Sequence, residues 1–258
     1  MIKNDRYLVI SDLQVPFEHP KALEFCLRIK KEYGIPKTNI LCVGDETDQY
    51  FGGQWKKDIN AHHTALSEIT ESKEKFRPWF DAFPVMRLAI SNHGTRWQRK
   101  ALESDIPSIL MRRYEDVIGC PKTWRWQDQW LIKTKYPFLM EHGDRFGGRY
   151  PHIDALHVNG ISTVIGHHHC IGGVSYHNSK GFDYRDSVGI SGWGACAGSL
   201  IDFKKYAFQY GHKAKKKPIL GCVVVIDDGL RAVYVPLDEQ EKDALPSNSQ
   251  KPERCPIY

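Results

Sequence analysis

The sequence predicts an α/β fold, and three observations support that class. The chain has 258 residues, a length at which one α/β domain buries a sizeable core without disulfides or structural metals. Near the N-terminus, an apolar run, a helical segment and a second apolar run follow one another, as in a βαβ unit with parallel strands. Hydrophobic residues make up 41% of the chain and charged residues 26%, which excludes fibrous, collagen-like and wholly disordered proteins.

The βαβ unit covers the first part of the chain. Residues 7–10 form a short apolar run, which predicts a buried strand. Residues 19–33 carry apolar side chains at the spacing of one helix face, and Gly34 ends this predicted helix. Residues 40–43 are again apolar and predict the second strand.

Two helical segments and a third strand continue the alternation. Residues 62–80 predict a helix with a break near Pro78, because proline removes an intrahelical donor. Residues 85–90 predict a strand. Residues 97–117 predict a helical segment that is interrupted at Pro107.

From Trp124 onwards the pattern becomes rich in strands. Strands are predicted over residues 130–133, 138–141, 162–165, 223–226 and 232–235. Glycine-rich stretches predict loops at residues 147–148, 172–173 and 189–198. We expect a single domain over residues 1–238, followed by a polar, flexible tail over residues 239–258.

Charge and cysteine content narrow the class of protein further. The net charge of +5 is compatible with a polyanionic partner without requiring one. The seven cysteines are odd in number and widely spaced, and they include no C-x-x-C pair, which argues against a zinc ribbon or a disulfide scaffold. We recognise no signal peptide and no run of 18 apolar residues. We therefore expect a cytoplasmic protein without a membrane span.

Polar side chains that can bind metals or transfer protons follow the ends of five apolar runs. They are Asp12, Asp45, Asn92 with His93, His142, and His167 with His169. In open α/β sheets, ligands bind outside the carboxyl ends of the strands, so these five endings predict one common site. Any one of them taken alone is more often a turn residue, a helix cap or a packed histidine.

The order and spacing of these residues resemble the calcineurin-like metallophosphoesterase family, which includes the nuclease subunits of double-strand-break repair complexes. The family pattern is D-x-H, G-D-x-x-D, G-N-H-[DE], a lone His and G-H-x-H, often followed by Gly-Ser. The corresponding stretches here read D-L-Q from Asp12, G-D-E-T-D from Gly44, S-N-H-G from Ser91, His142, G-H-H-H from Gly166, and Gly198-Ser199. The glutamine in the first motif and the compact length resemble bacterial or bacteriophage members of the family.

The resemblance implies two mixed β-sheets packed as a sandwich and flanked by helices, in four layers. It also implies two divalent ions, foremost Mn²⁺, with Mg²⁺, Fe, Ni²⁺ or Zn²⁺ as further options. The implied ligand sets are Asp12, Gln14, Asp45 and His169 for one ion, and Asp45, Asn92, His142 and His167 for the other. Two ions about 3.5–4 Å apart need a shared anionic ligand, and Asp45 is the candidate. We expect His168 to point away, because alternate side chains of a strand face opposite sides.

The implied activity is hydrolysis of a phosphomonoester or phosphodiester by a hydroxide held between the two ions. The family pattern assigns His93 as the general acid and Asp48 as the carboxylate that orients it. Arg96 is a weaker candidate for binding a phosphate oxygen, because exposed arginines near a helix start are common without such a role. Monoesters, diesters, nucleotides and nucleic acids all remain open as substrates.

One departure from the pattern matters for activity. Gln14 stands where the family has histidine, and a neutral amide oxygen binds first-row metals more weakly than imidazole. Either the Asp12 site holds its ion less tightly, or the protein is a degenerate, non-catalytic member that binds a phosphate or a partner. We favour an active enzyme because the other ligands are present. The changes at Ser91 and Gly94 lie outside the coordinating pair.

A basic stretch in the C-terminal half bears on the partner. Lysines and a histidine alternate there with aromatic residues, namely Lys204, Lys205, Tyr206, Phe208, Tyr210, His212, Lys213 and Lys215–Lys217. Such a run binds single-stranded nucleic acid by charge and stacking in some proteins and is a solvated hairpin face in others. His62 and His63 are a weaker candidate for substrate contact. The sequence leaves the oligomeric state open.

Overall fold

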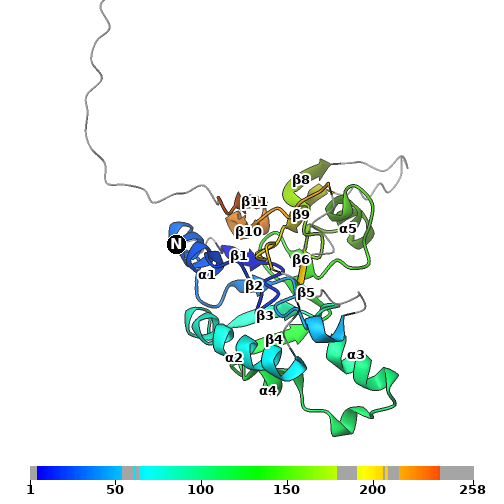
Figure 1. The fold of residues 1–258 in the computed structure, drawn as a ribbon. Helices are drawn as coiled ribbons and strands as arrows, with labels where there is room; N and C mark the ends of the chain where they lie inside the picture. The colour runs from blue at the N-terminus through cyan, green and yellow to red at the C-terminus, as the bar shows by residue number, and fades with distance from the viewer. Residues whose placement is uncertain are drawn as a thin grey trace, which may run out of the picture.

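The computed structural model describes residues 5–53, 61, 64–178, 191–205, 207–208 and 215–238. These residues form two mixed β-sheets, of six and five strands, together with five α-helices (Figure 1). The predicted α/β class with two mixed sheets is thereby confirmed. The predicted tail over residues 239–258 lies outside the described residues, and the single-domain assignment stays a prediction.

The larger sheet contains the βαβ unit and has the strand order β11-β10-β1-β2-β3-β4. Its strands are β1 (Tyr7–Ile10), β2 (Ile40–Cys42), β3 (Met86–Ala89), β4 (Trp124–Gln127), β10 (Gly221–Ile226) and β11 (Arg231–Pro236). Strands β1 to β4 run parallel, whereas β10 and β11 are antiparallel to their neighbours. The chain therefore leaves β1, β2 and β3 at the same edge of the sheet.

The smaller sheet has the strand order β5-β6-β7-β9-β8. Its strands are β5 (Gln129–Ile132), β6 (Phe138–Glu141), β7 (Thr163–Ile165), β8 (Gly172–Asn178) and β9 (Ser191–Ala197). Strands β6, β7 and β9 are parallel, and the two outer strands are antiparallel. The ends of β6 and β7 thus also lie side by side, joined by a bond from the Gly166 amide to the His142 carbonyl.

Helices connect most of the parallel strands. They are α1 (Ala22–Glu32), α2 (Ala65–Ala82), α3 (Arg96–Glu103), α4 (Tyr114–Ile118) and α5 (Pro151–Asn159), with short 3₁₀ turns η1 (Tyr50–Gly52), η2 (Ser108–Leu110) and η4 (Asp227–Gly229). The predicted interruption at Pro107 is confirmed, because α3 ends before it and η2 follows it. Among the described residues, no helix combines the length and apolar composition needed to cross a bilayer.

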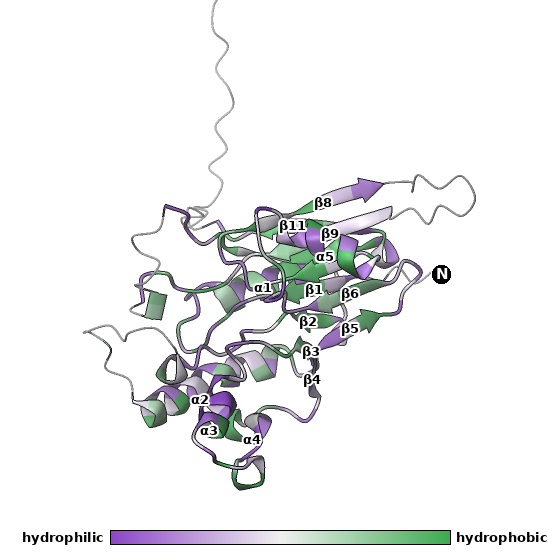
Figure 2. Cartoon of the chain, turned by 90° about the vertical axis from the view of Figure 1, so that its right-hand side faces the viewer, coloured by the Kyte–Doolittle hydropathy of each residue, from purple (hydrophilic) through white to green (hydrophobic). Residues whose placement is uncertain are grey.

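The alternation of side chains along β1 explains the layers. Leu8 and Ile10 face one core with residues of α1 and α2, whereas Tyr7 and Val9 face a second core with residues of the smaller sheet. A third cluster places Ala155 of α5 against the outer face of the smaller sheet. The two sheets therefore pack face to face, with α1 and α5 on opposite sides (Figure 1). The central strands are predominantly hydrophobic, as Figure 2 shows.

Two local predictions were wrong. Helix α2 continues through Pro78 to Ala82 instead of breaking, since Phe76 and Trp79 on either side of the proline are buried in the core. The glycine-rich stretches at residues 172–173 and 189–198 were expected to be loops, but β8 starts at Gly172 and β9 covers Ser191–Ala197. Their glycines permit close packing within a sheet rather than marking turns.

Candidate metal centre

The predicted ligands come from five loops that meet at the carboxyl ends of the strands. Asp12 and Gln14 follow β1, Asp45 follows β2 and Asn92 follows β3, whereas His142 follows β6 and His167 and His169 follow β7. Backbone bonds hold the first two loops together, for example from the Gln14 amide to the Asp45 carbonyl at 2.8 Å. Both sheets therefore contribute side chains to one place, as the strand-end argument predicts.

Two groups of metal-binding side chains share Asp45. Asp12, Asp45 and His169 form one group, and Asp45, His142 and His167 form the other. In each group, one ligand atom from each residue lies within 4.8 Å of the other two. Asp12 and Asp45 are 0% and 1% exposed, and buried carboxylates need compensating positive charge. A carboxylate common to two groups is the arrangement that two neighbouring divalent ions require.

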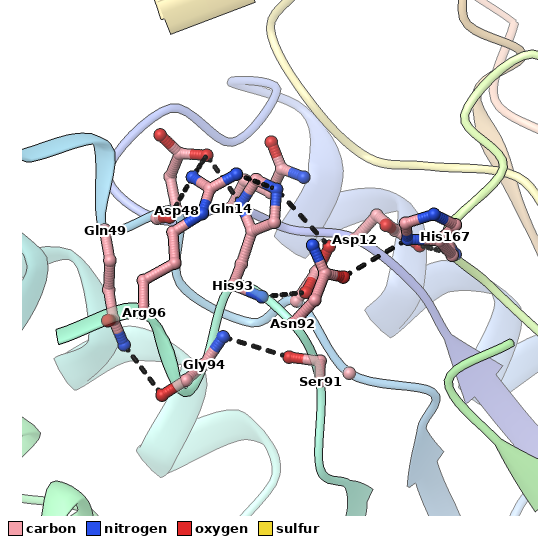
Figure 3. A network of polar contacts seen from close by, with 12 residues as sticks. Asp12, Gln14, Asp48, Gln49, Ser91, Asn92, His93, Gly94, Arg96 and His167 are labelled. Carbon is pink, nitrogen blue, oxygen red and sulfur yellow. Dashed lines mark hydrogen bonds and ion pairs between the residues drawn. The ribbon is translucent and has the colours of Figure 1, made fainter. Parts of the chain in front are cut away.

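Asn92 completes the group around His142 and His167. Its Oδ1 lies 2.7 Å from Nε2 of His142 and 3.2 Å from Nδ1 of His167 (Figure 3). The other ring nitrogen of His142, Nδ1, lies 2.8 Å from the Val43 carbonyl oxygen, which can only accept a hydrogen bond. The proton of a neutral His142 is therefore on Nδ1, and Nε2 turns its lone pair to the site. Such orientation by an outer partner is characteristic of metal-binding histidines.

Gln14 lies beside the other group. Its amide Nε2 is 3.0 Å from Nε2 of His169, which is itself 3.1 Å from Oδ1 of Asp12. Gln14 is fully buried, and its Oε1 has no hydrogen-bond partner among the described residues. Because the two ends of a glutamine amide are nearly isosteric, a half-turn brings the oxygen to the position of the nitrogen. Gln14 is thus placed to act as an oxygen ligand.

The backbone of the ligand loops adopts an uncommon conformation. Asp12, Gln14, Asp45 and His167 have positive φ angles of 44°, 48°, 52° and 64°, in the left-handed region that residues other than glycine rarely enter. Such conformations cluster at functional sites, where the surrounding structure stabilises them. Gly166 explains how the loops fit so closely, because a Cβ there would lie 2.5 Å from Ser11 Oγ and 2.7 Å from Asp12 Oδ2.

The charges of the site compensate one another. Burial alone would raise the pKa of Asp45, but the neighbouring His142 and His93 hold it below its usual value. Burial alone would lower the pKa of His142 and His169, but Asp45 and Asp12 raise both. Burial and the neighbouring His142 lower the pKa of His167 to about 4. His167 is therefore a neutral imidazole at pH 7, the form that binds metal ions.

The three residues expected to act on the substrate lie next to the ligands. His93 Nε2 is 3.9 Å from Asp45 Oδ2, and His93 Nδ1 is 2.8 Å from Asp48 Oδ1. Arg96 donates through Nη1 to the Asp48 carbonyl at 2.8 Å, and its Nη2 is in close contact with His93 Nε2 (Figure 3). The structure thus brings the candidate acid, its carboxylate and the arginine together at one side of Asp45.

The prediction for His168 was right for the wrong reason, and other predictions concern residues that the structure does not describe. His168 is outside both ligand groups, as expected, but the reason was wrong: β7 ends at Ile165, and residues 167–169 lie beyond the strand rather than in it. His62 and His63 lie outside the described residues, as do four members of the basic stretch, namely Tyr206, Tyr210, His212 and Lys213.

Two residues that support the candidate site were not identified from the sequence. Ser11 donates through its hydroxyl to Asp12 Oδ2, and Gln49 bonds the loop that carries His93. Ser11 adjoins a ligand in the sequence, which could have marked it. Gln49 directly follows Asp48, but no periodicity or family motif singles it out.

The donor set fits divalent metal ions. Carboxylate, imidazole and amide oxygen ligands suit Mn²⁺, Mg²⁺, Fe and Zn²⁺ to different degrees. Asp45 Oδ2 and Gln14 Oε1 are buried acceptors without a hydrogen-bond partner in the described part of the chain, and such atoms need a donor or a cation. No model of a known protein family matches the chain, and no curated protein is similar to it.

Proposed function

We propose that this protein is a two-metal phosphoesterase of the calcineurin-like metallophosphoesterase type. The observation that carries the proposal is the position of Asp45, which belongs to two buried Asp/His groups at once. A protein that bound a single structural ion would need one closed set of ligands. Two sets joined by one carboxylate instead match the paired sites that hydrolyse phosphoesters.

The proximity of the side chains supports two ligand sets. Asp12, Asp45 and His169 would hold one ion with Gln14, and Asp45, His142 and His167 would hold the other with Asn92. Divalent ions bound in this way lower the pKa of water towards neutrality and withdraw charge from phosphoryl oxygens. We expect Mn²⁺ or Mg²⁺ to be favoured over Zn²⁺ in the first set, because Gln14 offers oxygen in place of imidazole.

His93 supplies the proton for the leaving oxygen in this proposal. Its Nδ1 lies 2.8 Å from the Asp48 carboxylate, and a carboxylate at that position favours the tautomer with the proton on Nδ1. A guanidinium has only donors, so the contact of Arg96 with His93 Nε2 requires the lone pair there. His93 therefore carries a proton on Nε2 only when Arg96 has turned away, and a phosphate oxygen is a suitable acceptor for the released guanidinium.

Nucleic acid is the substrate class that we place first among phosphodiesters. The Ile219 amide donates to the His169 carbonyl at 2.7 Å. Lys216 and Lys217 precede Ile219 by three and two residues, so they lie on a segment that passes beside one ligand group. Binding of a polyanion at such a rim weakens steeply as salt increases, whereas hydrolysis of a small phosphomonoester depends little on salt.

Hydrolysis by metal-stripped protein titrated with Mn²⁺ tests the proposal. The substrates are bis-p-nitrophenyl phosphate and p-nitrophenyl phosphate, with Asp45→Ala as the site variant and Asp154→Ala, an exposed position on α5, as the matched control. We expect Mn²⁺-dependent turnover that Asp154→Ala retains and that Asp45→Ala reduces on the order of 100-fold or more. Tight binding of one ion without turnover would instead indicate a degenerate, non-catalytic protein.

A further inference from the structure

Gln49 joins the two loops that carry Asp48 and His93. It directly follows Asp48 in the sequence and is 5% exposed. Its Nε2 donates to the Gly94 carbonyl at 2.9 Å, and its Oε1 accepts from the Trp97 amide at 2.8 Å (Figure 3 draws the bond to Gly94). Gly94 directly follows His93, and Trp97 lies in the first turn of α3. The Gln49 side chain thus makes two hydrogen bonds to the segment that immediately follows His93.

The two bonds provide hydrogen-bond partners for backbone groups of that segment. The first N–H groups of a helix have no partner within the helix, and Thr95, which precedes α3, makes no capping bond through its side chain. Gln49 provides the missing acceptor from another loop. Its amide also presents a donor to Gly94, so that only a side chain with one donor and one acceptor at this spacing makes both bonds.

We propose that Gln49 is a positioning residue that fixes His93 relative to Asp48 and Asp45 for proton transfer. This inference rests on the proposed function, because it assigns Gln49 a part in the same reaction. Asp48 contacts the His93 ring directly at 2.8 Å, and Gln49 prevents the two loops from sliding past one another. Proton transfer depends on such alignment, and a displacement of about 1 Å costs roughly 100-fold in rate.

Leaving-group dependence tests this role. p-Nitrophenolate is a weak base and leaves without protonation. Phenolate is more basic, so its departure depends more strongly on a general acid. We expect Gln49→Leu to lower kcat about 10- to 100-fold for methyl phenyl phosphate and much less for methyl p-nitrophenyl phosphate, with KM unchanged. In a His93→Ala background, Gln49→Leu should have no further effect on methyl phenyl phosphate. Equal losses on both substrates, or losses that persist without His93, would overturn the inference.

Gln49→Glu provides a second variant that preserves the shape of the side chain. The new carboxyl group, when protonated, can donate to Gly94 and accept from Trp97, but its ionised form places an oxygen against the Gly94 carbonyl. We expect kcat of this variant relative to wild type to fall as pH rises through the pKa of the new carboxyl. A ratio that is constant with pH would contradict the role of the Gly94 bond. Gln98→Leu, also on α3, is the matched control.

NMR of the imidazole rings separates this inference from the proposed function. In Mg²⁺-loaded protein, Gln49→Leu should shift the His93 ring resonances, whereas the exposed His157 should not respond and Gln98→Leu should shift neither. If wild type hydrolyses no phosphoester but the His93 resonances respond to Gln49→Leu, the positioning link stands and the proposed function falls. If wild type is active and the His93 resonances do not respond, the inference falls and the proposed function stands.

Discussion

At the scale of single residues, the centre depends on how closely neighbouring groups can approach. Gly44 and Gly166 allow the ligand loops to touch, since a Cβ at Gly44 would lie 2.7 Å from the Ser91 Cβ. The buried carboxylate of Asp45 accepts a hydrogen bond from the His93 amide at 3.1 Å. Asp45 Oδ2 lies 3.9 Å from His93 Nε2 and has no hydrogen-bond partner within the described part of the chain. The result is an arrangement that a cation would complete.

Gln14 offers the sharpest test of ligand chemistry. Histidine tolerates positive φ better than most residues, so Gln14→His can keep the φ of 48° observed there. We expect it to tighten Zn²⁺ binding in the Asp12 group by about 10-fold or more, because imidazole is the stronger ligand. Competition with a chromogenic zinc chelator measures this, with Gln127→His on the exposed end of β4 as the control. Unchanged affinity would mean that the side chain at position 14 does not reach the ion.

At the scale of elements, helix α2 supports the loop that follows Asp48. Glu68 of α2 is 2% exposed and accepts hydrogen bonds from the amides of Tyr50 and Phe51 at 2.8 and 3.1 Å. Burial raises the pKa of Glu68 to about 7 and Asp48 adds to the increase, against the effect of the two amides. The turn η1 is therefore attached to α2 through a carboxyl group that ionises near neutral pH.

The raised pKa of Glu68 predicts a pH dependence of stability. Between the ordinary carboxyl pKa of 4.5 and about 7, the unfolded chain loses a proton that the folded protein keeps. Stability from this group is therefore fully present below pH 4.5 and falls as pH rises to about 7. Across this pH range, we expect the free energy of unfolding of wild type to fall by about 3 kcal/mol more than that of Glu68→Gln. Urea unfolding of both proteins between pH 4.5 and 8 measures it, and parallel pH profiles would refute the assignment.

Close packing of α5 on the smaller sheet predicts that a larger residue at Gly194 destabilises the protein. A Cβ at Gly194 of β9 would lie 2.0 Å from the His152 carbonyl oxygen of α5. Gly194→Ala must therefore push the helix from the sheet, and overpacking of this kind costs about 1–3 kcal/mol. Gly147→Ala is the control, because a Cβ there meets nothing within 4 Å. Urea denaturation should separate the two variants, and equal stabilities would contradict this account of β9.

The same elements indicate what the sequence can predict. Strands β1, β2 and β3 follow from apolar runs, and the polar residues after them gather where parallel strands end. Strands β8 and β9 do not follow, because their glycines read locally as turns while their role is to admit Tyr234 and α5. Helix α5 was not predicted, because its sequence does not separate apolar from polar residues into two clear faces. The convergence of the two Asp/His groups was therefore easier to predict than the elements around them.

At the scale of the whole molecule, the centre lies where the two sheets meet. The core between them contains residues of both, such as Val9 and Val43 of the larger sheet and Val164 of the smaller. Asp12 and Asp45 come from loops of the larger sheet, whereas His142, His167 and His169 come from loops of the smaller. These candidate ligands thus come from both sheets, and ions held there would bind the folded protein and not the unfolded chain.

This coupling predicts that metal ions stabilise the fold as a whole. Each site that binds only the folded state adds about 2.7 kcal/mol when free metal is at 100 times the dissociation constant. For a protein of this size that amounts to a rise in Tm of roughly 5 °C or more per site. Calorimetry of metal-stripped protein with added Mn²⁺ should show the rise, and a chelator should reverse it. Asp45→Asn should lose most of the shift because it belongs to both ligand groups, whereas Asp154→Asn should retain it. An equal shift in Asp45→Asn would place the bound ions outside the centre.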